Sequence, residues 1–94
     1  MVNNNISSVL QLGIEAHKAG NASTAEEHYL AVLNEQIDHA DANHNLGILL
    51  ANKEIERSLN YLKSALEKDP SQGQYWLSYI EVLILADKKE DAVK

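Results

Sequence analysis

Apolar residues recur every three or four positions along almost the whole chain, which is the period of an amphipathic α-helix. No segment shows the strict alternation of a half-buried strand, so the pattern predicts an all-α fold. Gly20 suits a left-handed helix end, Ser23–Glu26 has the form of a capping box, and Pro70 stops a helix. The first helix is expected to start near Ser7 or Ser8 and to end at Gly20, and the second spans about 24–36. Asp38 or Asp41 is expected to cap the third, which runs to about 51. The fourth runs from after Asn52 to about 68, the fifth spans about 73–86, and residues 87–90 open a short sixth helix.

Residues 42–70 have the pattern of two such helices joined by a tight turn. The small residues Gly47, Ser58 and Ala65 lie among their apolar positions. A small residue costs helix stability or core volume unless another helix approaches closely at that point. We therefore expect a helical hairpin in which Gly47, like Gly13 earlier in the chain, is a contact point between two helices. Such a hairpin needs neighbours of the same kind to bury its apolar surface.

The chain repeats itself with a step of 33 or 34 residues. The pair Leu12 and Gly13 recurs as Leu46 and Gly47. Ala25 and Tyr29 correspond to Ser58 and Leu62, and Ser58 corresponds to Ala92. Val9 and Leu12 correspond to Asn43 and Leu46, and these two correspond to Trp76 and Tyr79. Self-similarity at this period is the signature of a repeat architecture. Residues 1–94 are thus expected to form one domain with repeats at about 6–39 and 40–72 and a truncated third repeat at about 73–94.

These positions resemble the tetratricopeptide repeat, whose pattern runs W-x-x-L-G-x-x-Y, then A-x-x-x-F, then A and P. The matching residues are Leu12, Gly13, Ala25 and Tyr29, then Leu46, Gly47, Ala65 and Pro70, then Trp76 and Ala92. Residues 74–93 are similar to the repeats that precede glycosyltransferase, sulfotransferase or methyltransferase domains in bacterial proteins. The resemblance implies antiparallel helix hairpins stacked as a short right-handed solenoid of about two and a half repeats.

Charge and composition narrow the function classes. The net charge of −6 argues against nucleic-acid binding, which needs a basic stripe. No apolar run approaches the roughly 18 residues of a membrane span, and the first residues have neither the basic nor the apolar part of a secretory signal. We therefore expect a cytoplasmic protein without nucleic-acid or membrane partners. The absence of cysteine excludes disulfides and thiolate metal sites.

The first helix of each repeat carries two apolar stripes. In the first repeat, the stripe expected to face the partner helix of the same hairpin is Val9, Leu12, Gly13 and Ala16. In the resembled fold the first helices line a concave side on which an extended partner segment lies, so the second stripes and a row of amide and hydroxyl groups predict a peptide groove. The candidate groove residues are Leu10, Gln11, Ile14, His17, His44, Asn45, Ile48, Leu77, Ser78 and Glu81. A solvated polar face is the alternative interpretation of the row Gln11, Asn45 and Ser78.

Other chemistry has little support in the sequence. The carboxylate clamp of chaperone-binding repeats is not expected, because the matching places lack its cations and only Asn45 fits. His39, Asp41 and His44 lie close together, but their spacing makes them diverge on a helix, so we expect no metal site and no cofactor. No residue pairing suggests a nucleophile with its base. This stretch alone is therefore not expected to be an enzyme.

Two function classes remain open. One is a stand-alone interaction module or scaffold that binds a protein, as a peptide or a helix, in the groove. The other is the leading array of a larger bacterial transferase, in which the repeats position a substrate or partner. The ending in mid-repeat favours the second, with Met1 as the native start.

The truncated third repeat also predicts self-association. Stacked repeats end in an apolar face unless a polar helix covers it. We expect that face to be partly bare here and to form a homodimer, through Trp76, Tyr79, Ile80, Leu83 and Ile84. Exchange of the terminal helices between chains is the alternative.

Overall fold

The computed structural model describes residues 5–92, and this part of the chain contains five α-helices and no strand. They are α1 (Ile6–Lys18), α2 (Ala22–Glu35), α3 (Ala40–Leu50), α4 (Ile55–Lys68) and α5 (Gly73–Ala92). The predicted all-α fold is confirmed. The last part of the predicted third repeat, residues 93 and 94, lies outside the described residues.

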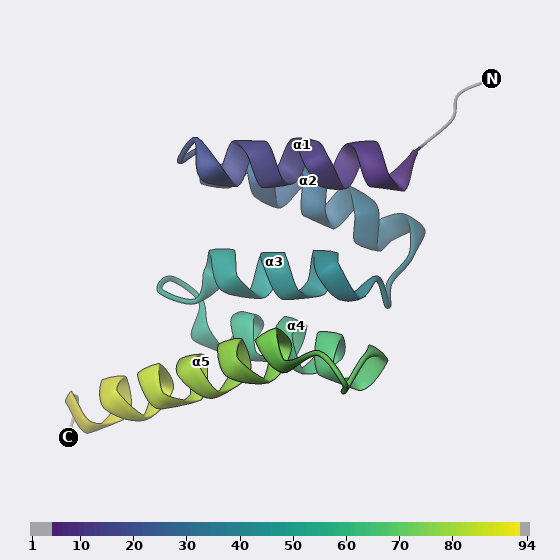
Figure 1. The fold of residues 1–94 in the computed structure, drawn as a ribbon. Coiled ribbons are helices and arrows are strands. Elements are labelled where there is room, and N and C mark those ends of the chain that lie inside the picture. Colours follow the sequence, from purple (N-terminus) through teal and green to yellow (C-terminus); the bar gives the residue numbers. More distant parts are fainter. Residues whose placement is uncertain (1–4, 93–94) are drawn as a thin grey trace.

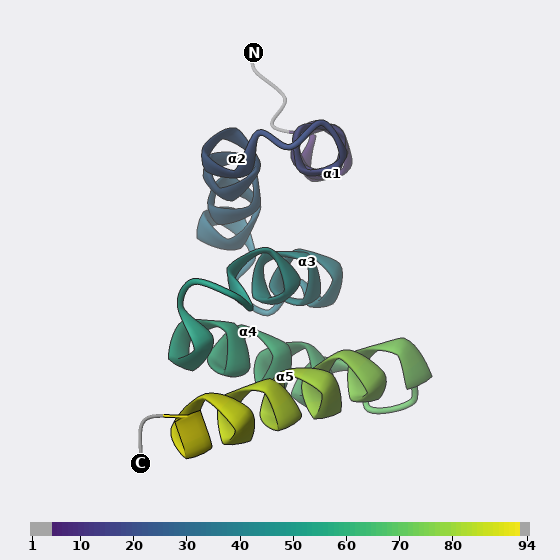
Figure 2. The same cartoon turned by 90° about the vertical axis from the view of Figure 1, so that its left-hand side faces the viewer.

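The helices form two stacked hairpins followed by one further helix (Figure 1). α1 packs against α2, α3 packs against α4, and the first hairpin meets the second mainly where α2 contacts α3. In Figure 2, α1 and α3 lie on one side of the stack and α2 and α4 on the other. α5 lies at the opposite end of the molecule from α1, against α4 and α3. The first helices of the two hairpins thus share one layer, as the repeat pattern implies.

Helix ends follow local chemistry, with several shifts from the predicted positions. Gly20 has φ of 83°, the left-handed conformation expected after α1. Asn5, and not Ser7 or Ser8, caps that helix, because its side-chain oxygen accepts from the backbone N–H of Ser8 at 3.3 Å.

The predicted caps of the next two helices are wrong. α2 begins at Ala22, so Ser23 lies inside the first turn and cannot act as the N-cap of a capping box. α3 is capped by His39, whose Nδ1 accepts from the N–H of Ala42 at 3.2 Å, in place of Asp38 or Asp41. Histidine is an unusual cap, which is why the sequence pattern pointed to the neighbouring aspartates.

The predicted sixth helix does not form, because α5 continues without a break from Gly73 to Ala92. The predicted turn at Asp87 lacks the glycine, asparagine or proline that follows α1, α3 and α4, and residues 85–90 are mostly good helix formers. Lys89 also donates to the backbone carbonyl of Asn52 at 3.2 Å and ties the last turns of α5 to the turn before α4. The two and a half repeats are therefore two hairpins and one long helix.

The buried core forms two clusters, a larger one between α2 and α3 and a smaller one between α4 and α5. Tyr29, Val32, Leu46 and Leu62 are almost completely buried. Ser58, also buried, donates from its hydroxyl to the carbonyl of Gly47 at 2.7 Å and so satisfies both polar groups inside the second hairpin.

Leu12 departs from its predicted place on the face of α1 that packs on α2. Its side chain is 50% exposed, whereas its repeat equivalent Leu46 is fully buried. Leu46 belongs to the cluster that joins the two hairpins, in which α2 covers α3. Within the described residues no helix precedes α1, so nothing covers the same position there.

The two hairpin glycines are sites of very close helix approach, as predicted. A β-carbon on Gly47 would lie 2.6 Å from Cγ and Cδ2 of Leu62 and 3.2 Å from the carbonyl oxygen of Ser58. A β-carbon on Gly13 would lie 2.7 Å from the ring of Tyr29. Both neighbours are buried and have little room to move, so each hairpin keeps this close helix spacing only with glycine at this position.

Gly47→Ala is expected to lower the free energy of unfolding by about 1 kcal/mol, because overpacking outweighs the gain in helix propensity. Gly47→Leu should cost about 3 kcal/mol or more. The matched control is Gly73→Ala, since nothing lies within 4 Å of a β-carbon there. Urea unfolding checks all three, and an unchanged midpoint for Gly47→Leu would show that the helix faces are wrongly assigned.

Candidate functional site

The candidate groove lies on the layer formed by α1, α3 and the first half of α5. Ile48 and Leu77 are 40% and 49% exposed, and Gln11 and Glu81 are exposed as well. Leu10, Ile14, His17 and Asn45 are half-buried, and the first two pack partly against the core. Eight of the ten candidate residues are thus at least partly open to solvent.

Three candidate residues meet in one hollow between α1 and α3. This pocket of about 290 Å³ is lined by Ile14, His17, Lys18, Tyr29 and Asn45. His17 and Tyr29 fix its floor, with Nδ1 of the imidazole 3.0 Å from the phenol oxygen. Burial raises the pKa of Tyr29, so the phenol stays neutral. Lys18 and Tyr29 were not among the predicted site residues, since the repeat pattern assigned Tyr29 to the core.

His44 and Ser78 are not groove residues, contrary to the prediction. They are 7% and 4% exposed, and Nε2 of His44 lies 2.8 Å from the hydroxyl of Ser78. The imidazole also packs on the ring of Tyr75, with centroids 4.8 Å apart. The two side chains point between α3 and α5 because a helix that stacks on α3 covers this side of it. The predicted row Gln11, Asn45 and Ser78 therefore loses its third member.

A second polar contact joins the same two helices. The hydroxyl of Tyr75 donates to Oδ1 of Asp41, and both this pair and the His44–Ser78 pair are separated by 34 residues, one repeat length. Burial and the neighbouring carboxylate of Asp41 raise the pKa of Tyr75 well above its ordinary value. Burial lowers the pKa of His44 despite the attraction of Asp41. Both shifts arise from helix packing and not from a solvent-facing reactive site.

The residues considered for metal binding are used elsewhere. His39 caps α3, His44 faces Ser78, and Asp41 accepts from Tyr75. Among the described residues, no group of three or more histidine, aspartate or glutamate side chains is arranged to hold a metal ion.

In the same part of the chain, no helix combines the length and apolarity needed to cross a membrane.

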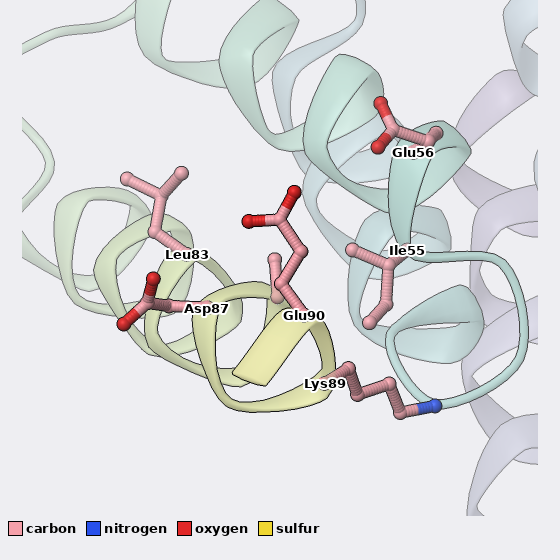
Figure 3. Close-up of a pocket in the computed structure, with 7 residues that line it drawn as sticks. Ile55, Glu56, Leu83, Asp87, Lys89 and Glu90 are labelled. Carbon is pink, nitrogen blue, oxygen red and sulfur yellow. The ribbon is translucent and has the colours of Figure 1, made fainter. Parts of the chain in front are cut away.

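Two hollows of more than about 450 Å³ lie outside the predicted groove. One, of about 470 Å³, opens between α2 and α4 and includes Leu30, Ile37 and Tyr61. The other, of about 490 Å³, lies between the start of α4 and the end of α5, with Ile55 and Leu83 on opposite walls (Figure 3). Glu90 points toward its opening, and Lys89 points away to the turn before α4. The only sequence signal for the first hollow was Ile37, an apolar residue where the repeat pattern has proline.

No family model and no curated protein sequence matches this chain. A solved structure does: a mutant O-GlcNAc transferase of Thermobaculum terrenum superposes with a TM-score of 0.82 and 25% sequence identity. The match covers 89% of this chain and 17% of the transferase chain, in its tetratricopeptide-repeat region. The fold is that of a tetratricopeptide-repeat domain. This confirms the resemblance to the tetratricopeptide repeat that was drawn from the recurring leucine–glycine pairs and the other matching positions.

The tetratricopeptide-repeat fold accounts for the distribution of exposed residues. Each first helix uses one side to pack within its hairpin, at Gly13 and Gly47, and another to contact the neighbouring repeat, at His44. The remaining side is open and carries Gln11, Ile48 and neighbouring residues, and on α1 the side with Leu12 is open as well. The chain spans less than a fifth of the matched transferase, so the likeness concerns the repeats and not that protein's catalytic part.

The buried His44 predicts a stability that depends on pH. Because its pKa in the folded state lies below the ordinary 6.5, the unfolded chain binds the proton more readily. Stability is therefore complete above about pH 6.5 and falls as the pH drops toward the lowered pKa. Urea unfolding at about pH 7.5 and about pH 5.5 should show a larger loss for the wild type than for His44→Gln, which does not titrate. An equal loss in both proteins would contradict a buried, neutral His44.

Proposed function

We propose that this domain is a non-catalytic binding module that holds a peptide or helix of a partner protein across α1, α3 and α5. The observation that carries the proposal is the set of apolar side chains on α1 and α3, the first helices of the two hairpins, and on α5. Ile14 is half-buried beside a pocket, while Ile48 and Leu77 are 40% and 49% exposed. Apolar anchors one helix apart, with polar groups between them, suit an amphipathic or extended segment that crosses the helices.

Asn45 would orient the bound peptide. Its amide lines the pocket between α1 and α3 and lies between Ile14 and Ile48 on the open layer. An amide carries both a donor and an acceptor, so it can bond the N–H and C=O groups of a peptide backbone whatever the side chains are. Burial of the apolar anchors then supplies most of the affinity, at about 25 cal/mol per Å² of apolar surface.

A catalytic role has no support in the geometry. His44 and Tyr75 have displaced pKa values, but both are enclosed between α3 and α5 and neither lines any of the pockets described above. Their pKa shifts follow from burial in a helix junction, and such shifts occur in structural networks as well as in active sites.

A second candidate function is supported by the comparison with solved structures. The match to the repeat region of an O-GlcNAc transferase favours a leading array that positions a substrate or partner for a catalytic domain. The coding sequence after Lys94 distinguishes the two proposals. An open reading frame that continues into a transferase domain supports the array, and a stop codon supports the stand-alone module.

Ile48→Glu is expected to weaken binding at least tenfold, equivalent to about 1.4 kcal/mol. The probes are peptides of about twelve residues selected from a random phage-displayed library on the immobilised wild-type chain. The matched control is Leu30→Glu, because Leu30 has nearly the same exposed fraction, 38%, but lies in the hollow on the opposite layer. Isothermal titration calorimetry measures both variants. Loss of binding in Leu30→Glu and not in Ile48→Glu would move the site to α2 and α4.

Asn45→Ala is expected to weaken the same peptides by about 1 kcal/mol, the contribution of a hydrogen bond to the peptide backbone. The melting temperature should change little, since Asn45 is partly exposed and takes no part in the His44–Ser78 contact. Wild-type affinity in both Asn45→Ala and Ile48→Glu would exclude the open layer as the binding site.

A further inference from the structure

The outer face of α5 is the largest exposed apolar feature of the described residues. Its members are Trp76, Leu77, Ile80, Leu83 and Ile84, each between 42% and 51% exposed. They share one side of the helix, while Tyr75, Ser78 and Val82 on the other side are buried against the second hairpin. A helix that is apolar all round is normally covered on every side. We call these five residues the α5 stripe.

The α5 stripe cannot accept a partner helix in the way that α1 and α3 do. In the repeat pattern Ile80 occupies the place of Gly13 and Gly47. At those glycines a single β-carbon would lie within 2.8 Å of the facing side chain, so the hairpin spacing leaves no room for isoleucine. α5 also runs straight through the position at which a hairpin would turn. The α5 stripe therefore suits a contact in which the two helices lie further apart than the paired helices of a hairpin.

The apolar residues of the α5 stripe are spaced symmetrically about Ile80. Leu77 and Leu83 lie three residues before and after Ile80, and Trp76 and Ile84 lie four residues before and after it. If two α5 helices cross antiparallel at Ile80, every apolar residue of one meets an apolar residue of the other. This is the requirement of a two-fold interface, in which the same surface is used twice.

Two further details favour the same crossing. Trp76 donates from its indole N–H to the carbonyl of Pro70 at 2.8 Å, so this half-exposed ring is already held in place. At the ends of the stripe, Asp87 would face the region of Gly73 in the second copy, where α5 begins. A carboxylate beside a helix N-terminus is favourable.

We propose that the chain, when no partner is bound, forms a symmetric homodimer through an antiparallel α5–α5 contact centred on Ile80, which covers Leu77 and so competes with a partner at the α5 end of the open layer. The stripe exposes on the order of 400 Å² per chain, and flanking atoms bring the buried total to about 1,000 Å². That area is at the lower end for specific interfaces and predicts dissociation in the micromolar range. Among the described helices, only α4 and α3 contact α5, which lies at the end of the stack away from α1 (Figures 1 and 2).

Sedimentation equilibrium between about 10 and 300 µM tests the association. The mass is expected to rise from one chain toward two, and Ile80→Glu should weaken association at least tenfold. Leu12→Glu is the matched control, because Leu12 is 50% exposed but lies on α1 at the other end of the molecule. Circular dichroism checks that both variants stay folded. A single-chain mass at every concentration, or equal weakening by both substitutions, overturns the proposal.

Disulfide trapping tests the geometry, since the natural chain has no cysteine. Ile80→Cys should form a covalent dimer on mild oxidation, because residue 80 lies opposite its own copy. Leu77→Cys and Ile84→Cys should each crosslink poorly alone, with copies at least about 9 Å apart along the helix axis, but should crosslink when mixed. Efficient self-crosslinking of both single variants would indicate a parallel pair and overturn the antiparallel contact, as would equal crosslinking of Leu12→Cys.

Discussion

The close approach of paired helices at Gly13 and Gly47 is the constraint on which the rest of the structure depends. A single β-carbon at Gly47 would collide with Leu62, so the spacing of the second hairpin is set by the absence of a side chain. The same holds for Gly13 against Tyr29. With both hairpins closed in this way, α1 and α3 lie in one layer, and their remaining open sides form the surface that we propose binds a partner.

The junction between α3 and α5 is held by different chemistry. Inside each hairpin, the two helices touch through close apolar contacts at Gly13 and Gly47. The histidine–serine and tyrosine–aspartate hydrogen bonds instead fix α5 against the second hairpin. Directional bonds at this junction specify one register, because a shifted helix would leave the buried His44, Ser78 and Tyr75 without their partners. This junction fixes one side of α5 and directs the α5 stripe away from the core.

Most of the fold could be predicted from the sequence, because helical periodicity and the leucine–glycine pairs are local signals with direct structural consequences. The errors concern features that depend on neighbours. His44 and Ser78 are polar and were placed on the open layer, but tertiary stacking buries them together. Leu12 matches Leu46 in the pattern but lacks a helix to cover it. The sixth helix was expected from repeat logic, yet residues 85–90 contain no residue that ends a helix.

The most direct test of the binding surface is nuclear magnetic resonance of the isotope-labelled chain during titration with a selected peptide. The account predicts that the largest amide shifts occur at Ile14, Asn45 and Ile48, with Leu30 and Ser64 on the opposite layer unchanged. Shifts confined to α2 and α4, with α1 and α3 unaffected, would contradict it.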